Sequence, residues 1–375
     1  MSALTWRWSF YINLPLGLSC APVYMFMIPS HVPKSINPED QSLTLLPKLL
    51  KLDIVGAILQ ILGWTCFVLA ISYGGILWAW KSAQVIALLT AAAVLFIAFG
   101  VQQYHSLLVP NPADRLFPCA FAASWELCIL FAQTAASIAA SFVSIFLIPV
   151  YFQFVRGATA LRAATSLLPF VILMVAGVII NGVMMGQTGR YTPFCLCGGI
   201  LVVIGGALMY TVDAGTSDTL IYVYSCLIAL GSGLYGQASF PVVQAKVNKC
   251  SCADACEEDP EEADDIIPRA VAFIGAAQMW GITVSLAVAN NIFLNYLQRA
   301  MDEILPGSSK LLLQGGVGAS KLLRLLKPDT KARVLEAIIG SLGQGYILVI
   351  VAGSLSVVLS LFMRWETVFL QPGVM

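Results

Sequence analysis

The sequence predicts an all-α integral membrane protein, because its composition is strongly apolar and its apolar residues are gathered into long runs. Hydrophobic residues make up 59% of the 375 residues and charged residues only 11%, and the mean hydropathy is +0.85. An average soluble domain carries about 25% charged residues, so this chain has too few to cover a globular surface. The formal net charge is zero and Lys and Arg are scattered, which argues against a nucleic-acid partner.

Nine apolar runs are long enough to cross a bilayer, which takes about 20 residues of helix. We expect helices because each run is continuous rather than alternating, and in lipid every backbone amide must be bonded within its own segment. The first run lacks the basic start and small-residue cleavage site of a secretory signal, so we expect a retained helix there. The runs cover residues 8–28, 52–73, 83–104, 125–150, 163–186, 194–212, 220–243, 270–294 and 343–363.

Polar segments divide these runs into groups of one, two and six. Pro-containing connectors at 29–51 and 105–124 flank the second and third runs, and the last six are interrupted at 248–265 and 295–340. The segment 248–265 is an acidic insert. We expect it to be exposed and disordered, because eight carboxylates between Asp254 and Asp265 repel one another. The segment 295–340 is expected to be a long polar loop that carries short helices.

Five stretches, in this order along the chain, resemble one known family. The first, WRWSFYINLPLG, carries the motif residues Trp6, Arg7, Trp8, Asn13 and Pro15. The others are LIPVYFQFVRGATALRAATSLLPF from position 147, GQTGRYTPF from 186, ALGSGLYGQASFPVVQAKV from 229 and IPRAVAFIGAAQMWG from 267. Together they resemble the drug:proton antiporters with fourteen spanning helices, a branch of the major facilitator superfamily. Fungal efflux pumps for toxins and other secondary metabolites are the most similar members.

The resemblance implies a major facilitator fold that lacks its first five helices and keeps about nine. Residues 1–28 would hold the last helix of the amino-terminal bundle, 29–124 a connector with a two-helix insert, and 125–375 the carboxy-terminal six-helix bundle. It also implies a multi-pass protein of the plasma membrane, with its carboxy-terminal tail in the cytosol, that exports small hydrophobic compounds in exchange for protons. We expect the chain as given to be incomplete as a transporter unless another chain supplies the missing helices. The alternative is a non-transporting membrane fragment or an interaction partner of a full-length transporter.

Within the runs, a few amides are candidates for a substrate cavity, since such cavities are mostly apolar with a few polar groups that fix orientation. The alternative is that each amide bonds a neighbouring helix. No Asp or Glu occupies the middle of a run: Asp53 and Glu126 are each the second residue of theirs. The chain therefore shows no proton relay of its own. The cavity candidates are Gln133, Gln237, Gln278 and Asn181, with Gln60 as a further amide.

Small and charged residues near the span ends suggest packing rather than chemistry. Gly182 and Gly186, four residues apart, are expected to let two helices approach closely. Gly189 and Arg190 resemble the second-bundle form of the family's charged loop motif, in which an arginine can fix helix ends through their carbonyls; an ordinary interfacial anchor is the alternative. GSGLYG, at 231–236, lacks the strand-loop-helix context of a phosphate loop.

The remaining reactive residues do not form a catalytic or metal-binding pattern. The two histidines, His31 and His105, both lie in connectors, and no convergent acid-base set is visible, so we do not expect an enzyme. The spacing of Cys250, Cys252 and Cys256 lacks the fourth ligand of a zinc site. We therefore expect neither a metal nor a cofactor.

Overall fold

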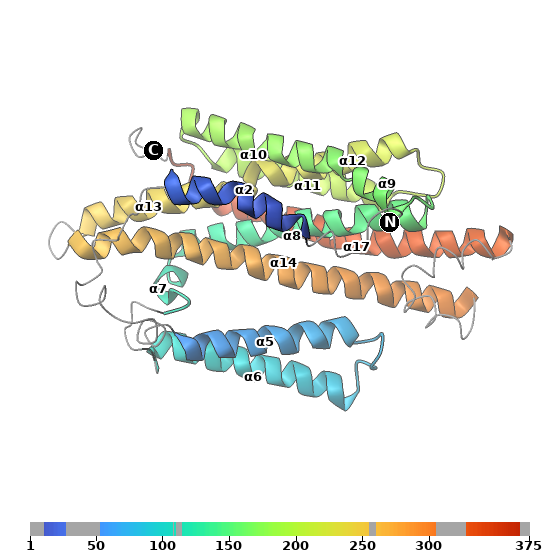
Figure 1. Cartoon of the computed structure of the whole chain (residues 1–375), viewed down its shortest axis with the longest axis horizontal. Helices are drawn as coiled ribbons and strands as arrows, with labels where there is room; N and C mark the ends of the chain where they lie inside the picture. The colour runs from blue at the N-terminus through green and yellow to red at the C-terminus, as the bar shows by residue number, and fades with distance from the viewer. Residues whose placement is uncertain are drawn as a thin grey trace.

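The computed structural model describes residues 11–27, 53–107, 109, 115–254, 260–304 and 328–367. Over these residues the long elements are all α-helices, and the one β-type pairing is an isolated bridge between Gly74 and Trp78. The longest helices lie roughly side by side along one axis (Figure 1). The predicted all-α class is therefore confirmed.

Eight helical segments in the described part are long and apolar enough to cross a membrane, against nine predicted. The difference is the first predicted span, where α2 (Asn13–Phe26) has 14 residues, none of them buried. Each of the other eight predicted runs overlaps one of these segments. They are Ile54–Tyr73, Ala83–His105, Trp125–Phe154, Ala160–Thr188, Thr192–Tyr210, Asp218–Val247, Ile266–Ile304 and Asp329–Phe362.

Six of these segments pack around one apolar core (Figure 1). α8 (Trp125–Phe154) contacts α12, α14 and α17, and α11 joins α12 to α17. Two short helices, α7 (Cys119–Ala122) and α9 (Ala160–Thr165), lie before and after α8. The remaining helices are α10 (Leu168–Thr188), α11 (Thr192–Tyr210), α12 (Asp218–Gly236), α13 (Ser239–Asp254), α14 (Pro260–Ile304) and α17 (Pro328–Phe362).

Small residues bring the helices of this bundle into backbone contact. A Cβ on Gly233 of α12 would lie 2.3 Å from the Met174 carbonyl oxygen of α10, and one on Gly198 of α11 would lie 2.6 Å from that of Gly231. Gly182 and Gly186 have open space around them instead, so the expectation of close packing there is wrong. The run at 231–236 serves helix packing, because its three glycines face α11, α10 and α8.

Hydroxyl groups inside the bundle bond mostly within their own helix. Thr134, Ser141 and Ser144 of α8 each donate to the carbonyl four residues earlier, at 2.9 to 3.0 Å. These bonds pair three hydroxyl hydrogens of α8 within the protein, which lets the helix be surrounded by others on several sides. The Tyr151 hydroxyl of α8 is an exception, because it is buried without a partner in the described part of the chain.

The pair α5 (Ile54–Tyr73) and α6 (Ala83–His105) packs through a narrower contact. Asp53 and Ser82 cap the two amino termini by accepting bonds from Gly56 and Val85. The described buried residues of α5 recur every seven positions, and those of α6 share that spacing before its last turn. A seven-residue repeat keeps one stripe facing a partner helix. The buried residues are Gly56, Gly63 and Ala70 on α5, and Val85, Ala92, Phe99, Gln102 and Gln103 on α6.

Two predicted segments differ from the structure. α14 continues to Ile304 and α17 begins at Pro328, so helix occupies 295–304 and 328–340 and the predicted loop over 295–340 is too long. The prediction of short helices within the loop falls on residues outside the described part of the chain. The backbone of 248–254 and 260–265 is also helical, so disorder is the wrong description there. Both stretches continue neighbouring apolar helices, so their polar composition alone was a poor guide to their backbone structure. The division into three parts at residues 28 and 124 stays a prediction.

Candidate functional site

The four predicted cavity residues differ in their burial and in their hydrogen bonds. Gln133 of α8 is fully buried, and its Nε2 donates to the Ser356 hydroxyl of α17 at 2.6 Å and to that of Ser360 at 3.4 Å. Its Oε1 is buried without a partner. The geometry of Gln133 is therefore that of an interhelical bond, the alternative raised for each amide.

Asn181 and Gln278 lie on different helices and differ in accessibility. Asn181 of α10 is buried, and its Oδ1 has no hydrogen-bond partner. Gln278 of α14 and Gln60 of α5 are both partly exposed. Any ligand reaching these amides from outside the bundle would meet Gln278 more readily than Asn181.

Gln237 lies at a break within a spanning segment. α12 ends at Gly236 and α13 begins at Ser239, inside the stretch Asp218–Val247. Pro241 causes the break, because it has no N–H to donate to the Gln237 carbonyl and its ring clashes with the oxygen four residues earlier. The carbonyl of Gln237 instead accepts from the amide of Phe240, at 3.4 Å.

Helix α8 holds this break from both sides. The Ser137 hydroxyl donates to the Ser232 carbonyl at 3.0 Å, before the break, and the Ser239 hydroxyl donates to the Leu130 carbonyl at 3.3 Å, after it. Both serines are buried, whereas the Gln237 side chain is exposed. The backbone is therefore held on both sides of Gln237, whose side chain is exposed at a point where a spanning helix is interrupted.

An ion-pair cluster joins four elements at one end of the bundle. Glu126, at the start of α8, accepts from Lys246 of α13 and pairs with Arg364, just after α17, at 3.3 Å. The Lys246 ammonium also lies 5.7 Å from the centre of the Tyr191 ring, just before α11. Burial raises the pKa of the Tyr191 phenol, although the charge of Lys246 opposes the shift. This cluster fixes helix ends and has no space for a ligand larger than a water molecule.

At the opposite end of α8, Arg156 also links the ends of helices. Its Nε pairs with Asp218 at 2.7 Å, and its other nitrogens donate to the carbonyls of Ala214 and Thr216. The arginine therefore ties the end of α8 to the loop between α11 and α12.

The family-motif residues are divided between described and undescribed parts of the chain. Gly189 adopts φ +64° as the carboxy-terminal cap of α10, and its amide donates to the Met185 carbonyl; the left-handed conformation favours glycine there. The Arg190 side chain is exposed, as an interfacial anchor would be. Asn13 and Pro15 are exposed on α2, and Trp6, Arg7 and Trp8 lie outside the described residues.

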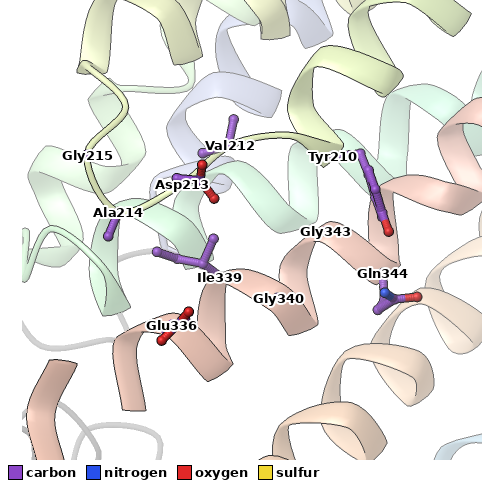
Figure 2. A pocket seen from close by; sticks show the side chains of 10 residues that line it. All are labelled: Tyr210, Val212, Asp213, Ala214, Gly215, Glu336, Ile339, Gly340, Gly343 and Gln344. Atoms are coloured by element: carbon purple, nitrogen blue, oxygen red, sulfur yellow. The ribbon is translucent and has the colours of Figure 1, made fainter. Parts of the chain in front are cut away.

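An open cavity of about 460 Å³ lies where α11 ends beside the first half of α17. Figure 2 shows Asp213, from the loop after α11, and Glu336, from α17, with Ile339 between them in this view. Tyr210 and Gln344 line its other end. None of the predicted cavity amides lines it, so this hollow is separate from the break at Gln237.

The sequence interpretation missed two features of this arrangement. It missed the helix break, for which Pro241 after a run of small residues was the available signal. It also missed the partner of Glu126, because Lys246 is 120 residues away and no local pattern links the two. Among the residues that the structure describes, no group of three or more His, Cys, Asp or Glu could hold a metal ion.

Known proteins similar to this chain match it along nearly its whole length. Residues 2–156 match the family described as fungal trichothecene efflux pump. The chain is 38% identical to the MFS-type transporter pgmG of Aspergillus terreus over 98% of its length and 62% of that relative's. It is 34% identical to the efflux pump alnA of Emericella nidulans, over 99% of this chain and 64% of the relative.

A third relative, the efflux pump patC of Aspergillus clavatus, is 34% identical over 97% of this chain and 63% of its own length. The chain thus spans somewhat less than two thirds of the relatives it matches. With its eight apolar helices it is a multi-pass membrane protein. Over nearly its whole length it is similar to fungal efflux pumps of the major facilitator superfamily.

Proposed function

We propose that this chain takes part in the export of small, mostly hydrophobic compounds, with the bundle of α8 to α17 as the half that contacts the substrate. The observation that carries the proposal is the exposed Gln237 at a proline-made break in a spanning segment. Transporters commonly bind substrate at interrupted helices, where the backbone is free of its regular helical bonds. An apolar surface with one exposed amide suits a hydrophobic compound that carries a hydrogen-bonding group.

The nature of the substrate follows from the relatives. The matching family is described by trichothecene efflux, and one further relative is a transporter of the phomenoic acid biosynthesis cluster. We infer that this chain handles a fungal secondary metabolite or a drug of similar polarity, at the plasma membrane. A catalytic role forms no part of the proposal.

Transport by alternating access needs one bundle to rock against another around a central site. We infer that the bundle described here works with a second bundle, supplied by a longer product of the same gene or by another chain. Among the described spans, Asp and Glu lie at or near the helix ends, as with Glu126 and Asp218. We therefore place the carboxylate that couples export to protons in the second bundle.

The test is a reconstitution in sealed vesicles with a fluorescent lipophilic dye. A chimera that carries the amino-terminal third of pgmG before Met1 should export the dye when a proton gradient is imposed, whereas the 375-residue chain should not. A folded chimera without gradient-dependent export would contradict the role of this bundle. Robust export by the 375-residue chain would show that no second bundle is needed.

The site itself is tested within that chimera. Gln237→Ala should raise the KM for the dye several-fold and leave protein level unchanged, because the side chain is exposed and bonds no other helix in the described part of the chain. Gln187→Ala is the matched control, since this glutamine is also exposed but lies at the end of α10. Equal effects of the two substitutions would remove Gln237 from the site.

A further inference from the structure

The two-helix pair α5–α6 touches the bundle through a small number of specific contacts. α5 packs against α14, and the pair lies along one side of that helix (Figure 1). We propose that these contacts fix the pair to α14, so that α5, α6 and the bundle move as one body, and that Asn291 and Asn295 are the positioning residues. The inference goes beyond the proposed function, because transport does not require it.

The first contact is aromatic and lies midway along the helices. The rings of Trp64 on α5 and Trp280 on α14 have centres 5.9 Å apart. Trp280 also stacks on Phe117 of the connector, with centres 5.4 Å apart and planes 13° apart. Phe117 in turn contacts Phe131 of α8 and Phe273 of α14. One aromatic cluster thus includes residues from the pair, the connector and the bundle.

The connector is itself bound to the pair. The Phe117 amide donates to Gln103 Oε1 at 2.9 Å, and Gln103 Nε2 donates to the buried carboxylate of Asp53. Gln102 donates to the same carboxylate at 2.9 Å. A Cβ at position 56 would lie 2.3 Å from Asp53 Oδ2. Because Gly56 has no side chain, it leaves room for the Asp53 carboxylate and its hydrogen bonds. The ring of Phe117 therefore packs on the bundle while its backbone is held by the pair.

The second contact is polar and lies at the far end of α5. Asn291 Nδ2 donates to the carbonyls of Ile71 and Gly74, the latter at 2.8 Å, and Asn295 Nδ2 donates to Gly74 at 3.2 Å. The Ile71 carbonyl lacks its usual helical donor, because the amide of Gly75 turns to Trp78 at 2.7 Å. Carbonyls left open at a helix end need donors from elsewhere. Here the donors come from α14.

The spacing of the two contacts shows that the helices run together. Gly74 follows Trp64 by 10 residues, and Asn291 follows Trp280 by 11. At about 1.5 Å per residue these intervals are about 15 and about 17 Å. Parallel helices held at two points so far apart can neither pivot nor slide freely. Gly75, with φ +81°, allows the approach, since a Cβ there would lie 2.2 Å from Asn295 Oδ1.

The proposal is tested by distance measurement between the pair and the bundle. Spin-labelled unnatural amino acids at Val94 of α6 and Val351 of α17, which are 64% and 57% exposed, leave all the cysteines in place. The purified 375-residue chain in lipid nanodiscs should give one narrow distance distribution at pH 5.5 and at pH 7.5. A broad wild-type distribution, or one whose mean differs between the two conditions, would overturn the proposal.

The asparagines are tested in the same measurement. Asn291→Ala with Asn295→Ala should broaden the distribution at least twofold, and Asn290→Ala, a partly exposed neighbour, should leave it unchanged. If the double variant does not fold, Asn295→Ala alone, which keeps the two bonds that Asn291 donates to α5, should broaden it less. A distribution unchanged by the loss of Asn295 and Asn291 overturns their role. None of these outcomes depends on transport, so failure here is distinct from failure of the export assay.

Discussion

Helices α5 and α8 have similar apolar compositions but are stabilised in different ways. Fifteen of the 30 residues of α8 are buried, against three of the 20 residues of α5, all of them small. α8 contacts helices on several sides and carries buried hydroxyl and amide groups, whereas α5 buries one stripe every seven residues. Hydropathy therefore indicates the number of spans, while the pattern of small and polar residues indicates how many sides of each span other helices cover.

The contrast is sharpest in what lies against a glycine. In the bundle, Gly233 faces a backbone carbonyl; in the pair, Gly63 faces the ring of Phe96, whose nearest atom would lie 3.1 Å from an added Cβ. Backbone cannot move without displacing a helix, but a ring can shift by a few tenths of an ångström. An added methyl group should therefore cost far more stability in the bundle than in the pair.

Gly233→Ala should be the most damaging change, with a loss of about 3 kcal/mol in the free energy of unfolding, since α10 and α12 must separate to admit the methyl group. The midpoint of thermal unfolding in detergent measures it. Gly182→Ala, in open space on α10, is the control and should not lower the midpoint. A small loss for Gly233→Ala would mean that the two helices can part easily.

Glu126→Gln should destabilise the bundle by about 1–2 kcal/mol, because Lys246 then loses its charged partner. The expected loss is below that of a fully buried pair, since the Glu126 side chain is 32% exposed. Glu366→Gln is the comparison, because that carboxylate is 52% exposed and lies 3.7 Å from Arg364; it should have almost no effect. A double-mutant cycle with Lys246→Met measures the coupling energy between Glu126 and Lys246. A coupling energy near zero would show that this ion pair does not stabilise the bundle.

Gln133→Leu should cost about 1 kcal/mol, the usual value of a hydrogen bond between spanning helices. The change removes the bond to Ser356 but also the unpaired Oε1, so the two effects partly cancel. The same unfolding midpoint gives the result, with Ser356→Ala as the reciprocal variant. A stabilised Gln133→Leu protein would show that this amide is kept for something other than packing.

Gly63→Ala should change the unfolding free energy by less than about 1 kcal/mol, because the Phe96 ring can give way and alanine favours the helix. Its effect should be several times smaller than that of Gly233→Ala, measured in the same detergent. Equal effects at the two positions would remove the distinction between the pair and the bundle.

Much of the architecture could be predicted from local sequence. Eight of the nine predicted spans correspond to helices, and most of their boundaries differ by a few residues, because an apolar run of sufficient length has to be a helix in lipid. The errors fall where an apolar helix continues into polar sequence. The extension of α14 to Ile304 and the early start of α17 at Pro328 show that these helices continue beyond their apolar stretches.

The site could be predicted only in part. The amides were identified as types, but their surroundings were not: Gln133 bonds Ser356, 223 positions later, and Gln237 is exposed. Contacts of that separation have no local signature, because they depend on which face of one helix meets another. Pro241 was the exception, since a proline acts on the backbone within four residues.

The length and hydropathy of single segments are enough to identify a helical membrane protein and to locate its spans. The family resemblance was also present in short motifs. Only the packing of the helices determines which side chains are buried, that Glu126 pairs with Lys246, and that Asn291 donates to carbonyls at the end of α5. The physical reason is that these contacts join residues far apart in the chain, and they exist only when several helices have packed at specific angles and heights.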